Sequence, residues 1–457
     1  MDELDLCFAG AAEQARLVRA GEVSARELIE ATLRRITAID PHMNAYRVVF
    51  AEQALELAAM VDTAHDTSDP RRLLGVPIAI KDDTDVAGEI TAWGTDAYGA
   101  PAANDAEVVR RLRAEGAIVI GKTHVPEMTA WPWTDSATWG PTRNPWDLAR
   151  SPGGSSGGAA AAAATGMCGV ALGSDGGGSV RYPAAVTGLF GLKPGRDRIP
   201  LDAHRADAWN GLLAYGSLSR TVRDAALFLD TTAGTDCGFA LASPIPRLRV
   251  AVSFDPPHGS FAKLRSDRRR AVERVVALLH DLGHDVVERE IDYGGAMANS
   301  TIRYLDGVSH DVHTMARPER LERTTRRLAR LGSSIPRRTV AAARAREADV
   351  ARRMNAVFEH ADLVLTPMAG QPPPSIAARP TGLLGSLLHA NVAAWAVPWN
   401  VIGQPAASIP AGLDDDGLPL AVQLGARSDH EPILLNLAAQ IEKAQPWHRH
   451  RPPSPPR

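Results

Sequence analysis

Apolar residues are spaced along the chain in a pattern that predicts alternating helices and strands. Residues 11–64 carry them at helical spacing throughout. Short β-branched runs follow at 75–83 and 116–123, and the amphipathic segment 106–116 between them predicts a helix that ends at a glycine. Strand, helix and strand in this order predict an α/β fold with crossover connections.

The same alternation returns in the second half of the chain. We find no repeat and no linker, so the pattern favours one large α/β domain. The proline-rich tail at 447–457 is predicted to be disordered. The further segments are strands at 247–254, 362–367, 406–412 and 420–426, and helices at 269–286 and 431–444.

Composition excludes several classes of protein. The 457 residues hold 50 Lys and Arg against 53 Asp and Glu, a net charge of −3, whereas a dedicated nucleic-acid binder would show a basic excess. The three cysteines are far apart and form no CxxC motif, which fits a reducing compartment. The N-terminus is acidic, and no apolar run approaches the ~18 residues of a membrane span. We therefore expect a cytoplasmic protein that binds neither nucleic acid nor membrane.

One lysine has an unusual position. The chain contains only five lysines, and Lys81 directly follows the apolar run Gly-Val-Pro-Ile-Ala-Ile. Burial there would disfavour the ammonium form and leave Lys81 a neutral base. The competing interpretation, an ion pair with Asp82 or Asp83, stays open at this point.

Two serine-centred glycine clusters stand out, GGSSGG at 153–158 and GSDGGGSVR at 173–181. Each glycine inside a regular element costs about 0.5–1 kcal/mol, so this density favours turns whose backbone approaches a ligand over a plain core. Consecutive N–H groups from Gly176 to Ser179 could surround a developing oxyanion. Flexible loops are the alternative interpretation. The alanines at 159–164 predict a thin, buried helix.

Three other motifs are weaker. GAIVIGKT at 116–123 matches a phosphate loop, but the four residues between its glycines favour a strand instead of a loop. GGSSG matches a nucleophile elbow, but no strand precedes it. His310 and His313 lack a third metal ligand nearby.

Residues 317–353 are rich in arginine. They hold twelve arginines against four acidic residues, and Arg320, Arg323, Arg327 and Arg330 fall on one helical face. A solvated helix surface is the favoured interpretation, and an anion-binding rim is the alternative.

Several motifs together resemble the amidase signature family, over about residues 10–447 and in the family's order. The resemblance implies a single domain at 1–446 with a large mixed central β-sheet covered by helices on both faces. Within it we expect N-terminal helices at 1–65, the signature core at 70–200 and a variable, substrate-side segment at 290–355. The motifs are GVPIAIKD, GKTHVPEM, GPTRNPWDLARSPGGSSGGAAAA, GSDGGGSVRYPAAVTGLFGLKP, DLVLTP, and NVIGQPAASIPAG followed by GLPLAVQLGA.

The resemblance also implies a catalytic triad. Ser179 corresponds to the nucleophile, Ser155 to a bridging serine held by a cis peptide bond, and Lys81 to the base. The implied oxyanion hole is the backbone of Gly176, Gly177, Gly178 and Ser179. Ser174 and Gly176 depart from the family, which commonly has threonine and a β-branched residue there, but neither change removes a catalytic group. This chemistry needs no cofactor and no metal.

The expected activity is hydrolysis of aryl or bulky hydrophobic amides, extended to aryl carbamates (urethanes). Trp131, Trp133 and Trp139 lie in a segment that the resemblance places beside the scissile bond, and Trp399 lies in another that could reach the same cleft. An apolar cleft without a charged subsite would follow. We expect a small-molecule substrate and a monomer or homodimer. A glutaminase subunit of a tRNA-dependent amidotransferase and a non-catalytic binding protein remain alternatives.

Overall fold

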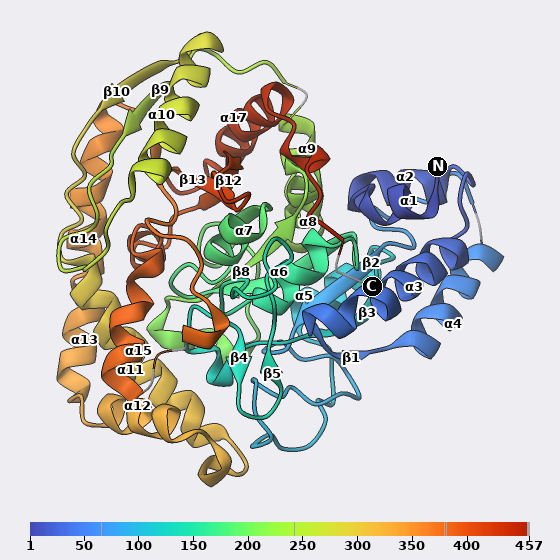
Figure 1. The fold of residues 1–457 in the computed structure, drawn as a ribbon, viewed down its shortest axis with the longest axis horizontal. Coiled ribbons are helices and arrows are strands. Elements are labelled where there is room, and N and C mark those ends of the chain that lie inside the picture. Colours follow the sequence, from blue (N-terminus) through green and yellow to red (C-terminus); the bar gives the residue numbers. More distant parts are fainter. Residues whose placement is uncertain (65, 242, 379, 381, 455–457) are drawn as a thin grey trace.

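Eleven strands of the described chain form one mixed β-sheet at the centre of the molecule (Figure 1). The computed structural model describes residues 1–454 except 65, 242, 379 and 381. In spatial order the strands are β1 (Tyr46–Val49), β3 (Ile118–Thr123), β2 (Pro77–Lys81), β6 (Val170–Asp175), β8 (Ala214–Ser219), β7 (Phe190–Lys193), β12 (Ala406–Leu413), β13 (Pro419–Gly425), β11 (Leu363–Pro367), β9 (Arg249–Val252) and β10 (Asp285–Glu288). A separate two-stranded ribbon joins β4 (Asp135–Ser136) to β5 (Gly140–Pro141).

The register of the sheet brings two strand ends together. β2 runs parallel to both of its neighbours, β3 and β6. The carboxyl ends of β2 and β6 therefore lie at the same edge of the sheet. Lys81 is the last residue of β2 and Asp175 the last of β6, so the sequence motifs around them meet at this edge.

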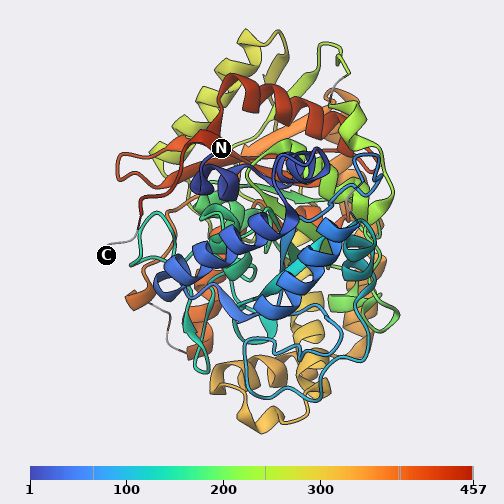
Figure 2. The same ribbon diagram turned by 90° about the vertical axis from the view of Figure 1, so that its right-hand side faces the viewer.

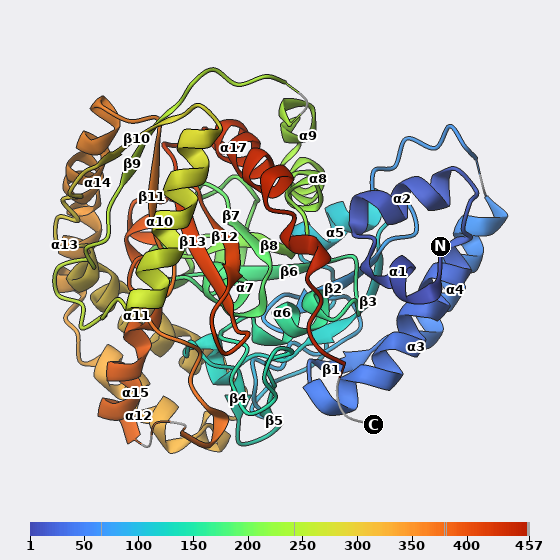
Figure 3. The same cartoon turned by 45° about the horizontal axis from the view of Figure 1, so that its top comes forward.

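The pleat of the strands sorts the core into two layers. Ile78 and Ile80 pack in one hydrophobic cluster, whereas Ala79 between them packs in another. The first cluster is covered by α5 (Glu107–Ala114), α8 (Val222–Ala233), α10 (Ser266–Asp281) and α17 (Glu431–Ala444). Figure 3 shows α10 and α17 lying across β12 and β13.

The opposite face carries the helices of the glycine clusters. α6 (Gly157–Ala164) packs on β6 and β2, and α7 (Arg181–Thr187) packs on β7 and β13. α3 (Ala25–Met43) and α4 (Ala51–Thr63) cover the β1 end, where Figure 2 shows the N-terminal helices in front of the sheet. α11 (Ala296–Thr314), α12 (Arg323–Ser333) and α16 (Val397–Val401) share a third hydrophobic cluster. The remaining helices are α1 (Glu3–Phe8), α2 (Ala11–Arg19), α9 (Cys237–Ala240), α13 (Arg337–Ala345), α14 (Glu347–Asn355) and α15 (Gly382–His389).

The predicted α/β fold, with a mixed sheet between helical layers, is confirmed, and so are the predicted strands. The alanine segment forms the buried helix α6, whose small side chains let it approach the sheet closely. Five strands of the sheet were not predicted: β1, β6, β7, β8 and β10. Within the segment predicted to be helical, Tyr46–Val49 forms β1 and pairs antiparallel with β3. Four residues between two helices give too short a pattern to reveal it.

The prediction for the C-terminal tail is wrong for its first residues. Trp447–Arg449 forms a 3-10 helix, and the Trp447 indole is buried with its Nε1 donating to the Arg220 carbonyl at 2.9 Å. Arg451 pairs with Asp5 at 2.6 Å. Residues 455–457 lie outside the described part of the chain.

The arginine-rich segment matches the favoured interpretation of a solvated surface. Arg323, Arg327 and Arg330 are exposed on α12. Arg320 precedes that helix and pairs with Asp96 at 3.0 Å.

Among the described residues, no helix is long and apolar enough to cross a membrane.

Candidate active site

Two glycine-rich turns lie side by side at the edge where β2 and β6 end. The first leads into α6, and the second connects β6 to α7. The Ser156 N–H donates to the Ser179 carbonyl at 3.2 Å and joins the two turns. Gly178 has a φ of +115°, and a Cβ there would lie 2.9 Å from the Ala396 Cβ, so only glycine fits this close approach.

The side chain of Lys81 is fully buried and reaches both turns. Its Nζ lies 2.7 Å from Ser155 Oγ, 2.7 Å from Ser174 Oγ and 3.2 Å from the Ser174 carbonyl. The Gly154–Ser155 peptide bond is cis. Two of the three predicted catalytic side chains, Lys81 and Ser155, are therefore in direct contact.

Burial lowers the pKa of Lys81 below its ordinary value, although the Asp83 carboxylate 3.5 Å away acts in the opposite direction. Asp82 cannot serve as the partner of Lys81, because it pairs with Arg47 at 2.5 Å and Lys122 at 3.0 Å. Of the two ion pairs that the competing interpretation allowed, only the one with Asp83 is therefore formed. The structure favours a lysine that deprotonates more readily than an exposed one.

Ser179 is half-buried at the tip of the second turn. Its hydroxyl has no hydrogen-bond partner in the described part of the chain. Of the four backbone N–H groups expected to form an oxyanion hole, that of Gly178 instead donates to the Asp175 carboxylate at 2.7 Å. The N–H groups of Gly176, Gly177 and Ser179 have no acceptor among the described residues and remain candidates.

Sequence reasoning missed the ion pair behind this turn. Asp175 and Arg181 are both fully buried, 2.9 Å apart. Burial raises the pKa of Asp175, but Arg181 outweighs it and holds the pKa well below its ordinary value. Asn400 Nδ2 donates to the same carboxylate at 2.9 Å, and Gln423 Oε1 accepts from Arg181 at 2.8 Å. The available signal was a charged pair that flanks a glycine run on an otherwise apolar stretch.

The predicted substrate-contacting tryptophans divide into two groups. Trp131 and Trp133 stack on each other with ring centroids 5.3 Å apart and an interplanar angle of 8°. Their backbone lies against Gly154, where a Cβ would come within 2.6 Å of the Trp131 carbonyl and the Trp133 nitrogen. These two residues therefore border the turn that carries Ser155.

The other two tryptophans lie elsewhere. Trp399 is 2% exposed and packs against Phe358 and the Gly425 backbone, which makes it a core residue. Trp139 contacts His124, at 5.9 Å between ring centroids, and borders a separate hollow beside α3. Their expected contact with substrate is not supported by these positions.

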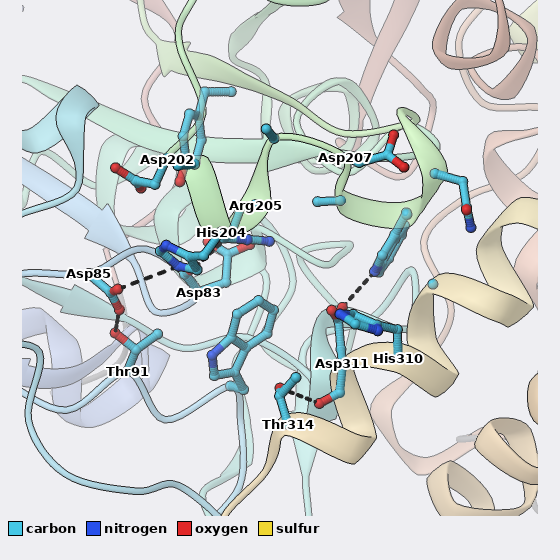
Figure 4. A pocket seen from close by; sticks show the side chains of 18 of the residues that line it. Asp83, Asp85, Thr91, Asp202, His204, Arg205, Asp207, His310, Asp311 and Thr314 are labelled. Atoms are coloured by element: carbon cyan, nitrogen blue, oxygen red, sulfur yellow. Dashed lines mark hydrogen bonds and ion pairs between the residues drawn. The ribbon is translucent and has the colours of Figure 1, made fainter.

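A cavity of about 710 Å³ adjoins the lysine side of the site (Figure 4). Trp93 and Trp209 line it, and the Trp209 ring also abuts Gly176, where a Cβ would meet it at 2.6 Å. The expected apolar cleft is thus not what this cavity provides: its lining is strongly acidic, and Trp131, Trp133, Trp139 and Trp399 are not part of it. The lining carboxylates are Asp83, Asp85, Asp202, Asp207, Asp306 and Asp311. Arg205, His204 and His310 also line the cavity.

Comparisons with known proteins agree on one family. The family model described as Amidase matches residues 27–435. AmiB2 of Mycobacterium tuberculosis, which is named as an amidase, is 48% identical over 99% of both chains. The solved structure of a 6-aminohexanoate cyclic dimer hydrolase has a TM-score of 0.89 at 32% identity, covering 98% of this chain and 99% of that one. A bacterial aryl acylamidase of the amidase signature family has a TM-score of 0.85 at 26% identity, covering 96% of each chain.

Proposed function

The chain belongs to the amidase signature family, a family of hydrolases that act on the C–N bonds of amides, and we propose that it hydrolyses its substrate through an acyl-enzyme formed on Ser179. In this proposal Ser155 connects the nucleophile to Lys81, which acts as the base. The observation that carries it is the contact of 2.7 Å between Lys81 Nζ and Ser155 Oγ, two side chains that are both buried.

This contact supports the first proton transfer of the proposed reaction. Neutral Lys81 accepts the Ser155 proton while Ser155 accepts that of Ser179, and Ser179 Oγ then attacks the amide carbonyl. Ser155 next donates a proton to the departing nitrogen and regains one from Lys81, which makes the amine a competent leaving group. Water repeats the sequence on the acyl-enzyme and restores all three side chains.

The oxyanion of each tetrahedral intermediate needs donors that are already in place. The N–H groups of Gly176, Gly177 and Ser179 are free for this role among the described residues, and they follow one another in a single turn. Removing one such donor typically costs about 100-fold or more in rate. The Asp175 carboxylate supports the turn from behind through the Gly178 N–H.

The proposed substrates are aryl or bulky hydrophobic amides, with aryl carbamates accepted by the same acyl chemistry and carbon dioxide lost afterwards. Support comes from the stacked Trp131 and Trp133 beside the Ser155 turn, which offer aromatic surface next to the reacting group. The similar fold of an aryl acylamidase points the same way.

A hydrolysis panel tests both parts of the proposal. Purified enzyme should give a higher kcat/KM for anilides and aryl carbamates than for acetamide or glutamine. The Ser179→Ala variant should lose turnover on every substrate and keep its fold. A preference for glutamine or acetamide would refute the substrate class, and turnover by Ser179→Ala would refute the nucleophile.

A further inference from the structure

The hydrogen-bonded chain of the active site does not end at Lys81. Lys81 Nζ lies 2.7 Å from Ser174 Oγ, and Ser174 Oγ donates to Asp83 Oδ2 at 2.5 Å. Asp83 is buried, 3.5 Å from Lys81 Nζ, and it also lines the acidic cavity. Ser155, Lys81, Ser174 and Asp83 thus form a continuous path from the catalytic serines to this cavity.

We propose that Asp83 is a positioning residue for Lys81: through Ser174 it sets the pH range in which Lys81 is the neutral base, and it accepts the Lys81 proton along this path. This inference rests on the proposed function, because it assigns Lys81 the role of base.

The proton transfer balances along the path. The Lys81 ammonium gives one proton to Ser174 Oγ as Ser174 gives its own to Asp83 Oδ2. Lys81 is then neutral, Ser174 is unchanged and Asp83 is a carboxylic acid. Return of that proton along the same path restores the Asp83 carboxylate and the Lys81 ammonium. No bond other than those to the moving protons changes.

Asp83 is well placed to dominate the charge around Lys81. A carboxylate 3.5 Å from an ammonium within a site closed to solvent favours the charged lysine strongly. Burial raises the pKa of Asp83, but Lys81 and Arg205 outweigh it and keep that pKa below its ordinary value. The other charged and titratable groups that face the pair are Asp175 on β6, Arg205 in the 3-10 helix Ala203–Arg205, Tyr215 on β8 and Asp311 on α11. Lys122 on β3 forms an ion pair with Asp82.

Asp85 offers a matched control. It carries the same charge and lines the same cavity, but its carboxylate accepts from Thr91 Oγ1 at 2.6 Å and lies 3.9 Å from His204. No hydrogen bond in the described chain connects it to Ser174 or Lys81. Asp83→Asn and Asp85→Asn each remove one negative charge beside the cavity, but only Asp83→Asn breaks the hydrogen-bonded path to Lys81.

The test is the pH profile of two rates, kcat/KM for an anilide and the rate of covalent labelling by a fluorophosphonate. Without its anion, Lys81 loses protons at lower pH. The acidic limb of both profiles should therefore move down by about one pH unit or more in Asp83→Asn, the usual scale for a neighbouring opposite charge. Asp85→Asn should move it by less than about a third of that. Ser174→Ala should lower kcat about tenfold or more with little change in KM, and Ser174→Thr should restore it.

Each outcome decides the question. An acidic limb that stays in place in Asp83→Asn, or that moves equally in Asp85→Asn, overturns the inference. If Asp83→Asn does not fold, wild-type kcat in Ser174→Ala overturns it instead. Failure of the wild-type enzyme to be labelled on Ser179 at any pH would refute the proposed function itself, which separates the two claims.

Discussion

At the scale of single residues, the active site is held by charges that no solvent reaches. Lys81, Asp175 and Arg181 are all 0% exposed. Burying an ion costs several kcal/mol unless partners satisfy it, and here each has them. Asp175 accepts from Arg181 and from the Gly178 N–H, so one carboxylate both neutralises the arginine and shapes the glycine turn.

Breaking this pair should destabilise the protein strongly. Arg181→Met leaves the Asp175 carboxylate buried without its cation, and the free energy of unfolding should fall by about 3–5 kcal/mol. Urea denaturation measures it. Arg352→Met, which removes an exposed partner of Asp349, is the control and should cost less than about 1 kcal/mol. Equal losses in the two variants would show that the buried pair has no special role.

The predictability of these residues follows from their surroundings in sequence. Lys81 was identifiable because an apolar strand precedes it, and the two serines because dense glycine is costly anywhere except at a close approach. Arg181 flanks the glycine run, but its role was not predictable from that position, since its partners Asn400 and Gln423 are more than 200 positions away and only the folded sheet brings them near. Family resemblance, not pattern, supplied the roles of the serines.

At the scale of elements, one carboxylate joins the tryptophan segment to the arginine-rich helices. Glu127, in the 3-10 helix Glu127–Thr129, accepts from the Glu322 N–H just before α12 at 2.9 Å. The side chain is buried, and burial raises its pKa to about 7. This contact spans segments whose proximity no local pattern predicts.

The raised pKa has a defined effect on stability. Because the folded pKa of about 7 lies above the ordinary value of 4.5, the folded state holds an extra proton between these values. The contribution of Glu127 to the free energy of unfolding is therefore highest at low pH, and it is lost as the pH rises from 4.5 through about 7. Glu127→Gln removes the titration, so the Tm of the variant should rise relative to wild type between pH 5 and pH 8. Tm curves that stay parallel over this range would contradict the assignment.

At the scale of the whole molecule, hydrogen bonds and an ion pair hold the two ends of the chain together. Figure 1 marks the N-terminus beside the N-terminal helices, and the C-terminal segment crosses toward the same side. The Arg220 guanidinium donates to the carbonyls of Cys7 and Phe8, its own carbonyl accepts from Trp447, and Arg451 pairs with Asp5. The C-terminal segment is therefore part of the fold up to about Arg451.

Two truncations test this. Ending the chain after residue 446 removes the buried Trp447, and the free energy of unfolding should fall by about 3 kcal/mol or more, the scale of a large-to-small change in a core. Ending it after residue 451 should leave stability unchanged. Denaturant unfolding of both proteins decides the point, and equal stabilities would show that the tail is dispensable.

The central claim is that Lys81, through Ser155, activates Ser179. Its most direct measurement is mass-spectrometric mapping of a fluorophosphonate adduct together with the rate at which the adduct forms. We predict a single adduct on Ser179 in the wild-type enzyme, none there in Ser179→Ala, and labelling about 100-fold or more slower in folded Lys81→Ala and Ser155→Ala. An adduct on another residue, or wild-type labelling in Lys81→Ala, would contradict the account.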